Sequence, residues 1–321
     1  MCVDAQVGRG CTAAKVIVMG EHSVVYGHPA VALPLTSLRM VAHARACAAG
    51  ESTLSALGWS GPLAQAPARF ASVVCAVEAA LQFAGCADRG VEVSTVSDFP
   101  EGRGLGSSAA AAGAVIRAVL AACGASATSA ELFELTQQAE RVAHGRPSGL
   151  DAMATASQVP ILFEQGRTSP VDMTMRAWLV IADSGVSGST RETVSHIRHG
   201  VEQDLPGVAS WLAELGQLAA DSVGDLRADR PRELGARMDR AHELLARLGV
   251  SIDALDRLVA ASRRAGALGA KLTGGGRGGC IIALADSADA AQTIARAVAA
   301  AGATQTWIHP LHHGGVEGKD S

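Results

Sequence analysis

Short β-branched runs alternate with turn residues in the early part of the chain. Between Ala14 and Ala46 the runs are KVIVM, SVVYG, AVALPL and RMVAHARA, and Gly20, Gly27 and Pro34 punctuate them. Val and Ile favour pleated strands, whereas glycine and proline favour turns. We therefore predict that each of these runs is a strand and that turns join them.

Helical spacing of apolar residues appears in the next part of the chain. We predict a helix over about 67–83, an alanine-rich helix over 107–123 and a third helix over 129–143, which has acidic residues in its first turn. The alternating sequence VEVSTV at 91–96 predicts a half-buried strand. Helices and strands thus fall in separate groups, which is typical of an α+β fold.

The second half repeats this mixture without an internal sequence repeat. Its length and pattern place a domain boundary near residue 167, giving an N-terminal domain of residues 1–167 and a C-terminal domain of residues 168–321. The elements expected around and after the boundary are strands at 159–163 and 177–183, helices through 190–265, a strand at 280–285, a helix at 288–301 and a strand at 304–310.

Composition narrows the class of partner. The chain is 48% hydrophobic and 18% charged, which is typical of a globular protein and not of a disordered one. A net charge of −4 offers no basic excess for a nucleic-acid backbone, and an aromatic content of 3% argues against base-stacking surfaces. A small-molecule ligand fits these values better.

Cysteine usage and hydropathy favour the cytoplasm. The seven cysteines are scattered and form no C-x-x-C pair, which indicates reduced thiols. The first fifteen residues lack the apolar core of a signal peptide. The longest apolar stretch, 109–123, is interrupted by Gly113 and Arg117, so we expect no membrane span.

A glycine loop precedes the alanine-rich helix, in the sequence FPEGRGLGSSAAAAG at 99–113. Its glycines permit positive φ and close approach of the backbone, and the helix start offers unpaired amides, so the segment predicts a phosphate cradle. An alternative makes Ser107 or Ser108 an ordinary N-cap. A Walker loop is excluded because no lysine follows, and the match of Gly104, Gly106 and Ala109 to a dinucleotide-binding pattern is weak in this context.

A second segment, QQAERVAHGRPSGLDAMA at 137–154, carries carboxylates beside a break in the helix. Glu140 and His144 lie one turn apart on one helix face. Asp151 follows the break, and its position allows two interpretations. It is either a catalytic carboxylate or the partner of Ser148 in a capping box. A third segment, KLTGGGRGGC at 271–280, contains five glycines between 274 and 279, which is more than a flexible hairpin requires.

These three segments, in this order, together with AAKVIVMGEHSVVYGHPAVALPL at 13–35, resemble the motifs of the GHMP kinase family. The resemblance extends from about residue 13 to residue 285. It implies a two-domain α+β fold: an N-terminal domain with a mixed sheet, a ferredoxin-like C-terminal domain that carries the third glycine segment, and an active site in the cleft between them. It also implies ATP as phosphoryl donor and Mg²⁺ as cofactor.

The letters GEHSVVYG after Met19 resemble the mevalonate kinase branch of this family. This similarity implies phosphorylation of mevalonate by ATP and allows a homodimer. Asp151 resembles the catalytic aspartate, and Lys15 the lysine near the reacting hydroxyl. Ser108 and Glu140 resemble the Mg²⁺ ligands. The residues that resemble the substrate side are Lys15, Glu21, His22, Asp151 and Thr190, and those that resemble the nucleotide loop are Gly102, Arg103, Gly104, Leu105, Gly106, Ser107 and Ser108.

The chain departs from the family pattern at a few positions. The usual P-G-K of the first motif is A-A-K here, and the third motif, commonly T-G-A-G-G-G-G, has Gly275 and Arg277 substituted. Neither change removes a charged or metal-binding group. The alternatives left open are a related kinase that acts on phosphomevalonate or a sugar, an inactive member that senses a metabolite, and a nicotinamide oxidoreductase.

Overall fold

The computed structural model describes residues 7–47, 52–145 and 147–311. Six cysteines lie in these ranges and all are free thiols, while Cys2 lies outside them. Within the described ranges, every helix is too short or too polar to span a membrane.

Internal contacts divide the chain into two compact units. Unit 1 consists of residues 1–15 and 34–158, and unit 2 of residues 16–33 and 159–321. The segment 16–33, which includes part of the first motif, therefore packs with unit 2. The domain boundary that we predict near residue 167 stays a prediction.

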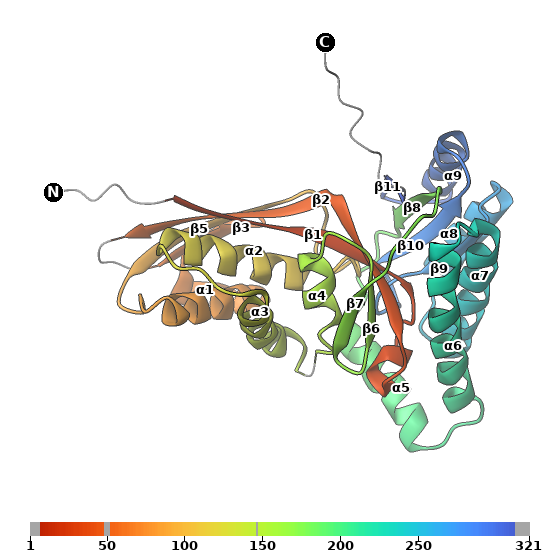
Figure 1. The fold of residues 1–321 in the computed structure, drawn as a ribbon, viewed down its shortest axis with the longest axis horizontal. Coiled ribbons are helices and arrows are strands. Elements are labelled where there is room, and N and C mark those ends of the chain that lie inside the picture. The colour runs from red at the N-terminus through yellow and green to blue at the C-terminus, as the bar shows by residue number, and fades with distance from the viewer. Residues whose placement is uncertain (1–6, 48–51, 146, 312–321) are drawn as a thin grey trace, which may run out of the picture. The chain divides into compact units, whose positions relative to one another are not determined.

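Unit 1 is built on a mostly antiparallel sheet. The strand order is β4-β3-β5-β2, with β1 pairing β2. Strand β3 pairs with β5 in parallel, whereas the pairs β3–β4 and β2–β5 are antiparallel. Strands β1 and β2 are long and continue into unit 2, as Figure 1 shows in red and orange. The bounds are β1 (Val7–Met19), β2 (Ala30–Cys47), β3 (Thr53–Ala56), β4 (Trp59–Pro62) and β5 (Gly90–Ser97).

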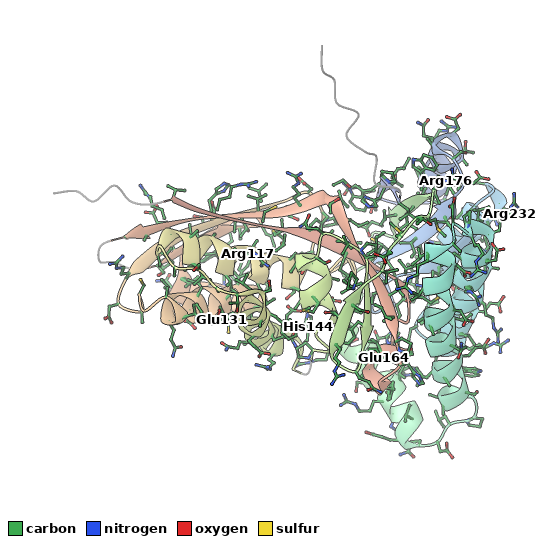
Figure 2. All side chains as sticks on the ribbon, in the orientation of Figure 1. Arg117, Glu131, His144, Glu164, Arg176 and Arg232 are labelled. Carbon is green, nitrogen blue, oxygen red and sulfur yellow. The ribbon has the colours of Figure 1, made fainter. Side chains whose placement is uncertain are left out.

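Four α-helices accompany this sheet, and α1, α2 and α3 pack on one another. They are α1 (Ala71–Phe83), α2 (Ser107–Ala122), α3 (Ser129–His144) and α4 (Leu150–Ala156), with 3₁₀ turns at Leu63–Gln65 and Ala68–Phe70. A capping box starts α3, because the Thr128 side chain accepts from the Glu131 amide and the Glu131 carboxylate accepts from the Thr128 amide. Glu131 is labelled in Figure 2.

Strand β1 lies directly against the backbone of α2. A Cβ added to Gly8 would lie 2.0 Å from the Ala118 carbonyl oxygen, and one added to Gly10 would lie 1.9 Å from the Ala114 carbonyl oxygen. The alanines that face β1 from α2 are buried. Small residues on both elements therefore let the strand and the helix approach to backbone contact, which fixes the end of β1 that leads to Lys15.

We expect Gly10→Ala to destabilise the protein by about 1–3 kcal/mol, the usual cost of overpacking, because the obstructing atom is backbone. Thermal or urea unfolding measures this. Gly200→Ala is the matched control, since the nearest atom to its new Cβ is a Val208 methyl at an ordinary 3.4 Å. Equal stability of the two variants would contradict the packing described for β1.

Unit 2 contains a hairpin, a four-stranded sheet and the remaining helices. Strands β6 (Ile161–Glu164) and β7 (Arg167–Pro170) form the hairpin, and β6 pairs with the start of β2. The four-stranded antiparallel sheet has the order β11-β8-β10-β9. Its strands are β8 (Trp178–Asp183), β9 (Gly269–Leu272), β10 (Cys280–Ala285) and β11 (Gln305–Pro310).

Helices α7, α8 and α9 pack on this second sheet, and α6 packs on α7. Every residue of β10 is buried, as expected for a strand in the interior of the sheet order. The helices of unit 2 are α5 (Thr190–Glu202), α6 (Val208–Arg227), α7 (Pro231–Arg247), α8 (Asp253–Arg264) and α9 (Ala288–Ala300).

The strand expected at SVVYG is wrong. Residues Ser23–Tyr26 form a 3₁₀ helix, η1, between Gly20 with φ 100° and Gly27 with φ 85°. These positive φ values turn the chain sharply on both sides, so the short run between them has no extended path. The turn expected at Pro34 is also wrong, since β2 runs through it. Pro34 lies between the parts of β2 that pair with β6 and with β5, so its missing N–H removes no bond to either strand.

Candidate active site

The glycine loop before α2 has the backbone that the sequence predicts. Gly102, Gly104 and Gly106 all have φ between 69° and 77°, a backbone conformation that residues other than glycine rarely adopt. Gly106 is the N-cap of α2, so both serines belong to the first turn of the helix. The alternative in which Ser107 or Ser108 is the N-cap is therefore not the arrangement found. The loop instead presents backbone groups at a positive helix end.

Lys15 lies in β1 beneath this loop. Its backbone N–H donates to the Leu105 carbonyl at 3.0 Å, and its Nζ donates to the Gly104 carbonyl at 3.2 Å. The same Nζ forms an ion pair with Asp151 Oδ1 at 2.9 Å. A Cβ on Gly106 would lie 3.0 Å from the Lys15 side chain. One ammonium thus joins the glycine loop to the carboxylate of the second segment.

The environment of Asp151 favours a chemical role over a capping role. The N-cap of α4 is Gly149 with φ 94°, and the Ser148 hydroxyl accepts from the Leu150 amide at 3.3 Å. The Asp151 carboxylate pairs with Lys15 instead of closing a capping box with Ser148. The Asp151 side chain is 41% exposed, whereas that of Lys15 is 2% exposed, so a buried cation holds an accessible carboxylate.

Ser108 and Glu140 meet beside this pair. The Ser108 hydroxyl donates to Glu140 Oε1 at 2.5 Å, and the Glu140 side chain is 3% exposed. Burial raises the pKa of Glu140, the Ser108 hydrogen bond and His144 lower it, and the charges of Asp151 and Lys15 act on it in opposite directions. His144, labelled in Figure 2, lies 3.7 Å from Glu140 one turn later on α3. The second segment and the glycine loop therefore form one cluster in unit 1.

This donor set fits Mg²⁺ better than a transition metal. A hydroxyl and a carboxylate are hard oxygen ligands, and Mg²⁺ is usually held by one or two carboxylates together with phosphate oxygens and water. Among the described residues, no group of three or more His, Cys, Asp or Glu side chains could hold a metal ion. Ser108 and Glu140 would hold the ion, and phosphate oxygens would complete its coordination.

The other residues expected on the substrate side lie in unit 2. Glu21 is fully buried and forms an ion pair with Lys271. His22 has φ 61° and is 6% exposed, and its Nε2 lies 3.0 Å from the Gly275 carbonyl oxygen. Burial lowers the pKa of His22 to about 4, so its imidazole is neutral near pH 7. Thr190 is exposed at the first position of α5.

The third glycine segment is closely packed, unlike a flexible hairpin. A Cβ on Gly276 would lie 2.3 Å from the Val250 carbonyl oxygen, and one on Gly275 would lie 2.6 Å from the Thr190 hydroxyl. The Gly279 amide donates to the Val186 carbonyl at 2.7 Å. The sequence reasoning gave no role to Lys271, although this lysine opens the segment. The sequence did contain one signal for it, because Lys271 is a charged residue in a strand that is otherwise apolar.

Known proteins are similar to this chain over most of its length. Residues 71–158 match the family model described as the GHMP kinases N terminal domain, and residues 222–304 match the one described as GHMP kinases C terminal. The mevalonate kinase of Thermococcus gammatolerans is 35% identical, with 91% of this chain and 92% of the relative covered. That of Pyrococcus horikoshii is also 35% identical and covers 85% of this chain and 87% of its own.

The chain belongs to the GHMP kinase family. Among solved structures, this GHMP kinase is similar to the L. major mevalonate kinase in complex with R-mevalonate, with a TM-score of 0.82, 25% identity, and 96% and 98% of the two chains covered. Its fold is the two-domain α+β fold of the family. The fold class expected from the sequence is confirmed.

Proposed function

We propose that this GHMP kinase is a mevalonate kinase, which transfers the γ-phosphoryl group of ATP to the primary hydroxyl of mevalonate and forms 5-phosphomevalonate. The relatives that support this substrate are the archaeal proteins named mevalonate kinase and the L. major protein solved with R-mevalonate. The GEHSVVYG sequence supports the same branch of the family.

A single observation supports phosphoryl transfer by this chain in particular. Lys15 Nζ contacts both the Asp151 carboxylate and the carbonyl of Gly104 in the glycine loop. An alcohol bound at Asp151 would therefore lie beside a buried ammonium and next to the loop proposed to hold the phosphates. The arrangement suits a reaction in which catalysis depends on positioning and on neutralising charge.

The proposed step moves one phosphoryl group and one proton. The alcohol oxygen forms a bond to the γ-phosphorus while the bond from that phosphorus to the bridging oxygen breaks, and ADP leaves. Asp151 orients the hydroxyl and accepts its proton late in the transfer. Lys15 stabilises the charge that develops on the alcohol oxygen, and the amides of residues 102–108 bind the β- and γ-phosphates.

We propose Ser108 and Glu140 as the Mg²⁺ ligands. The bound ion would neutralise charge on the phosphate oxygens. The hydrogen bond between the Ser108 hydroxyl and Glu140 brings the two oxygens together before metal binds. Burial of Glu140 also means that its carboxylate gains from a cation partner more than an exposed one would.

We expect Glu140→Gln to raise the Mg²⁺ concentration for half-maximal activity by roughly 10–100-fold, the range found when groups that support a metal are lost. The amide keeps the size of the side chain but loses its charge. Activity measured against Mg²⁺ at fixed ATP tests this. Glu134→Gln is the control, because Glu134 lies on the same helix in an exposed ion pair with Arg141. An unchanged Mg²⁺ dependence would remove Glu140 from the proposed ligands.

The substrate is tested with purified protein, ATP and Mg²⁺ by coupled detection of ADP. We expect turnover with mevalonate and a product with one phosphate monoester by ³¹P NMR. Phosphomevalonate, galactose and homoserine are the comparison substrates. Faster turnover of any of these would assign a different substrate, and binding of mevalonate without ADP release would support an inactive sensor. Binding of NAD or NADP would support the oxidoreductase alternative.

We propose that His22 and Thr190 contact mevalonate, in keeping with their resemblance to substrate residues of the family. The cytoplasmic location rests on the scattered cysteines, six of which are free in the described residues. The homodimer that the resemblance allows stays a prediction, and sedimentation or light scattering measures it.

A further inference from the structure

A buried ion pair lies next to His22 in unit 2. Glu21 and Lys271 each have 0% of the side chain exposed, and Lys271 Nζ donates to Glu21 Oε1. The same Nζ donates to the Leu272 carbonyl at 2.8 Å and to the Ile17 carbonyl at 3.4 Å. Burial of two charges is costly, and such a pair is often no more stable than apolar residues in its place. A role beyond stability would account for its presence.

The partner of His22 determines which of its ring nitrogens carries the proton. Nε2 lies 3.0 Å from the Gly275 carbonyl oxygen, which can only accept. Nε2 therefore carries the hydrogen, and in the neutral ring Nδ1 is left as an acceptor. Burial lowers the pKa of His22 to about 4, and the nearby positive charge of Lys271 adds to this effect. The neutral ring can accept a hydrogen bond from a hydroxyl, whereas it offers no positive charge to a carboxylate.

The ion pair and the His22 hydrogen bond attach the same turn to one segment. Lys271 lies at the end of β9 and holds Glu21, while Gly275 lies four residues later and holds His22. Thr273, between them, also attaches to β1, because its hydroxyl accepts from the Ile17 amide at 2.9 Å and donates to the Ile17 carbonyl at 3.1 Å. The Lys271 ammonium thus holds Glu21, and the Gly275 carbonyl holds His22, both from the same segment.

The same segment also touches Thr190. A Cβ added to Gly275 would lie 2.6 Å from the Thr190 hydroxyl oxygen and 3.0 Å from the Thr190 Cα. Gly275 therefore borders both His22 and Thr190, the residues proposed to contact the substrate. Close packing of Gly276 against Val250 holds this part of the segment in place.

We propose that Lys271, acting through Glu21, is a positioning residue that holds His22 as a neutral hydrogen-bond acceptor for a hydroxyl of the substrate. The tertiary hydroxyl of mevalonate is the group of matching chemistry, because the primary hydroxyl is the one that reacts. Glu21 then connects Lys271 to His22 and does not touch the substrate. This inference rests on the proposed function for the identity of the ligand.

The first test removes both charges with the double variant E21Q/K271M, which leaves no unpaired buried charge. We expect the KM for mevalonate to rise at least tenfold while the KM for ATP stays within twofold. The variant S262A is the control, since it loses a buried hydrogen bond to the Leu258 carbonyl and leaves the ion pair intact. It should change neither KM. A folded E21Q/K271M protein with an unchanged KM for mevalonate overturns the proposal.

Conservative variants keep the test available if the double variant does not fold. In E21D and K271R the charges remain but their positions shift. We expect each to raise the KM for mevalonate more than the KM for ATP, and equal changes in the two constants would count against positioning. A loss of stability alone, with both constants unchanged, would assign the pair a purely structural role.

A second test does not depend on turnover. ¹⁵N-detected NMR of the histidine side chains, with H22Q used to assign the signal, reports the tautomer and titration of His22. We expect the wild-type signal to be neutral with the proton on Nε2 at pH 6, and the pKa of His22 in E21Q/K271M to rise, because the lowering charge of Lys271 is lost while burial remains. A wild-type His22 that already titrates normally overturns the inference. If mevalonate gives no turnover but this signal is as expected, the proposed substrate fails and the positioning role stands.

Discussion

Asp151→Asn should lower kcat by roughly 10²–10⁴-fold, the usual contribution of a positioned general base, while the protein remains folded. The amide keeps the size of the side chain but cannot accept the proton of the alcohol. Lys15, the partner of Asp151, is 2% exposed, so the variant leaves a buried ammonium without its carboxylate and should also lower the melting temperature. Steady-state kinetics and a melting curve of the same sample measure the two effects.

A variant that weakens a helix cap is the control, because it should lower stability and leave kcat unchanged. Thr128→Ala removes the N-cap side chain of the capping box at the start of α3 and should cost about 0.5–2 kcal/mol of stability with kcat unchanged. If Asp151→Asn behaves like this control, with lower stability and near-normal kcat, then Asp151 is a structural residue and the proposed mechanism is wrong.

Lys15→Met should lower kcat by roughly 10²–10³-fold, the range found when one preorganised group that stabilises transition-state charge is removed. The methionine fills the same buried space between β1 and the glycine loop. It removes the ammonium that contacts the Asp151 carboxylate and the Gly104 carbonyl. We also expect a higher KM for ATP, because the loop loses one of its attachments to β1.

The control removes an ion pair of the same unit that lies on the surface. Arg45 and Glu92 pair at 2.5 Å with about half of each side chain exposed, so Arg45→Met should change neither kcat nor KM. A kcat for Lys15→Met within tenfold of the wild type would show that Lys15 contributes packing and not charge stabilisation.

Much of the candidate site in unit 1 could be predicted from the sequence because its signals are local. Glycines before a helix and carboxylates at helical spacing each suggest chemistry within one short segment. The resemblance to a family then suggested that Lys15 and Asp151, which lie far apart in the chain, both act at the reacting hydroxyl. The sequence pattern suggested the wrong capping residue for two helices, α2 and α4. Gly106 and Gly149, both with φ values that favour glycine, are the N-caps, and the neighbouring Ser108 and Asp151 are free for other contacts.

The sequence did not reveal the partner of Glu21. Nothing local links residues 21 and 271, and a buried lysine in a strand of four residues has no periodic signature. The same limit applies to Gly8 and Gly10, whose need for glycine arises from the backbone of α2 and not from their own conformation. Contacts of this kind depend on which surfaces meet, and local propensity carries no information about that.

The sequence by itself determined the order and type of most elements and the three glycine-rich or carboxylate-bearing segments, because hydrophobic period and glycine content act over a few residues. Only the tertiary structure decided that SVVYG is a 3₁₀ helix, that β2 continues through Pro34, and that Lys271 lies against Glu21. For β2 and Lys271 the deciding energy comes from residues distant in the chain, through sheet pairing and the pairing of a buried charge, whereas the 3₁₀ helix follows from the sharp turns at the flanking Gly20 and Gly27.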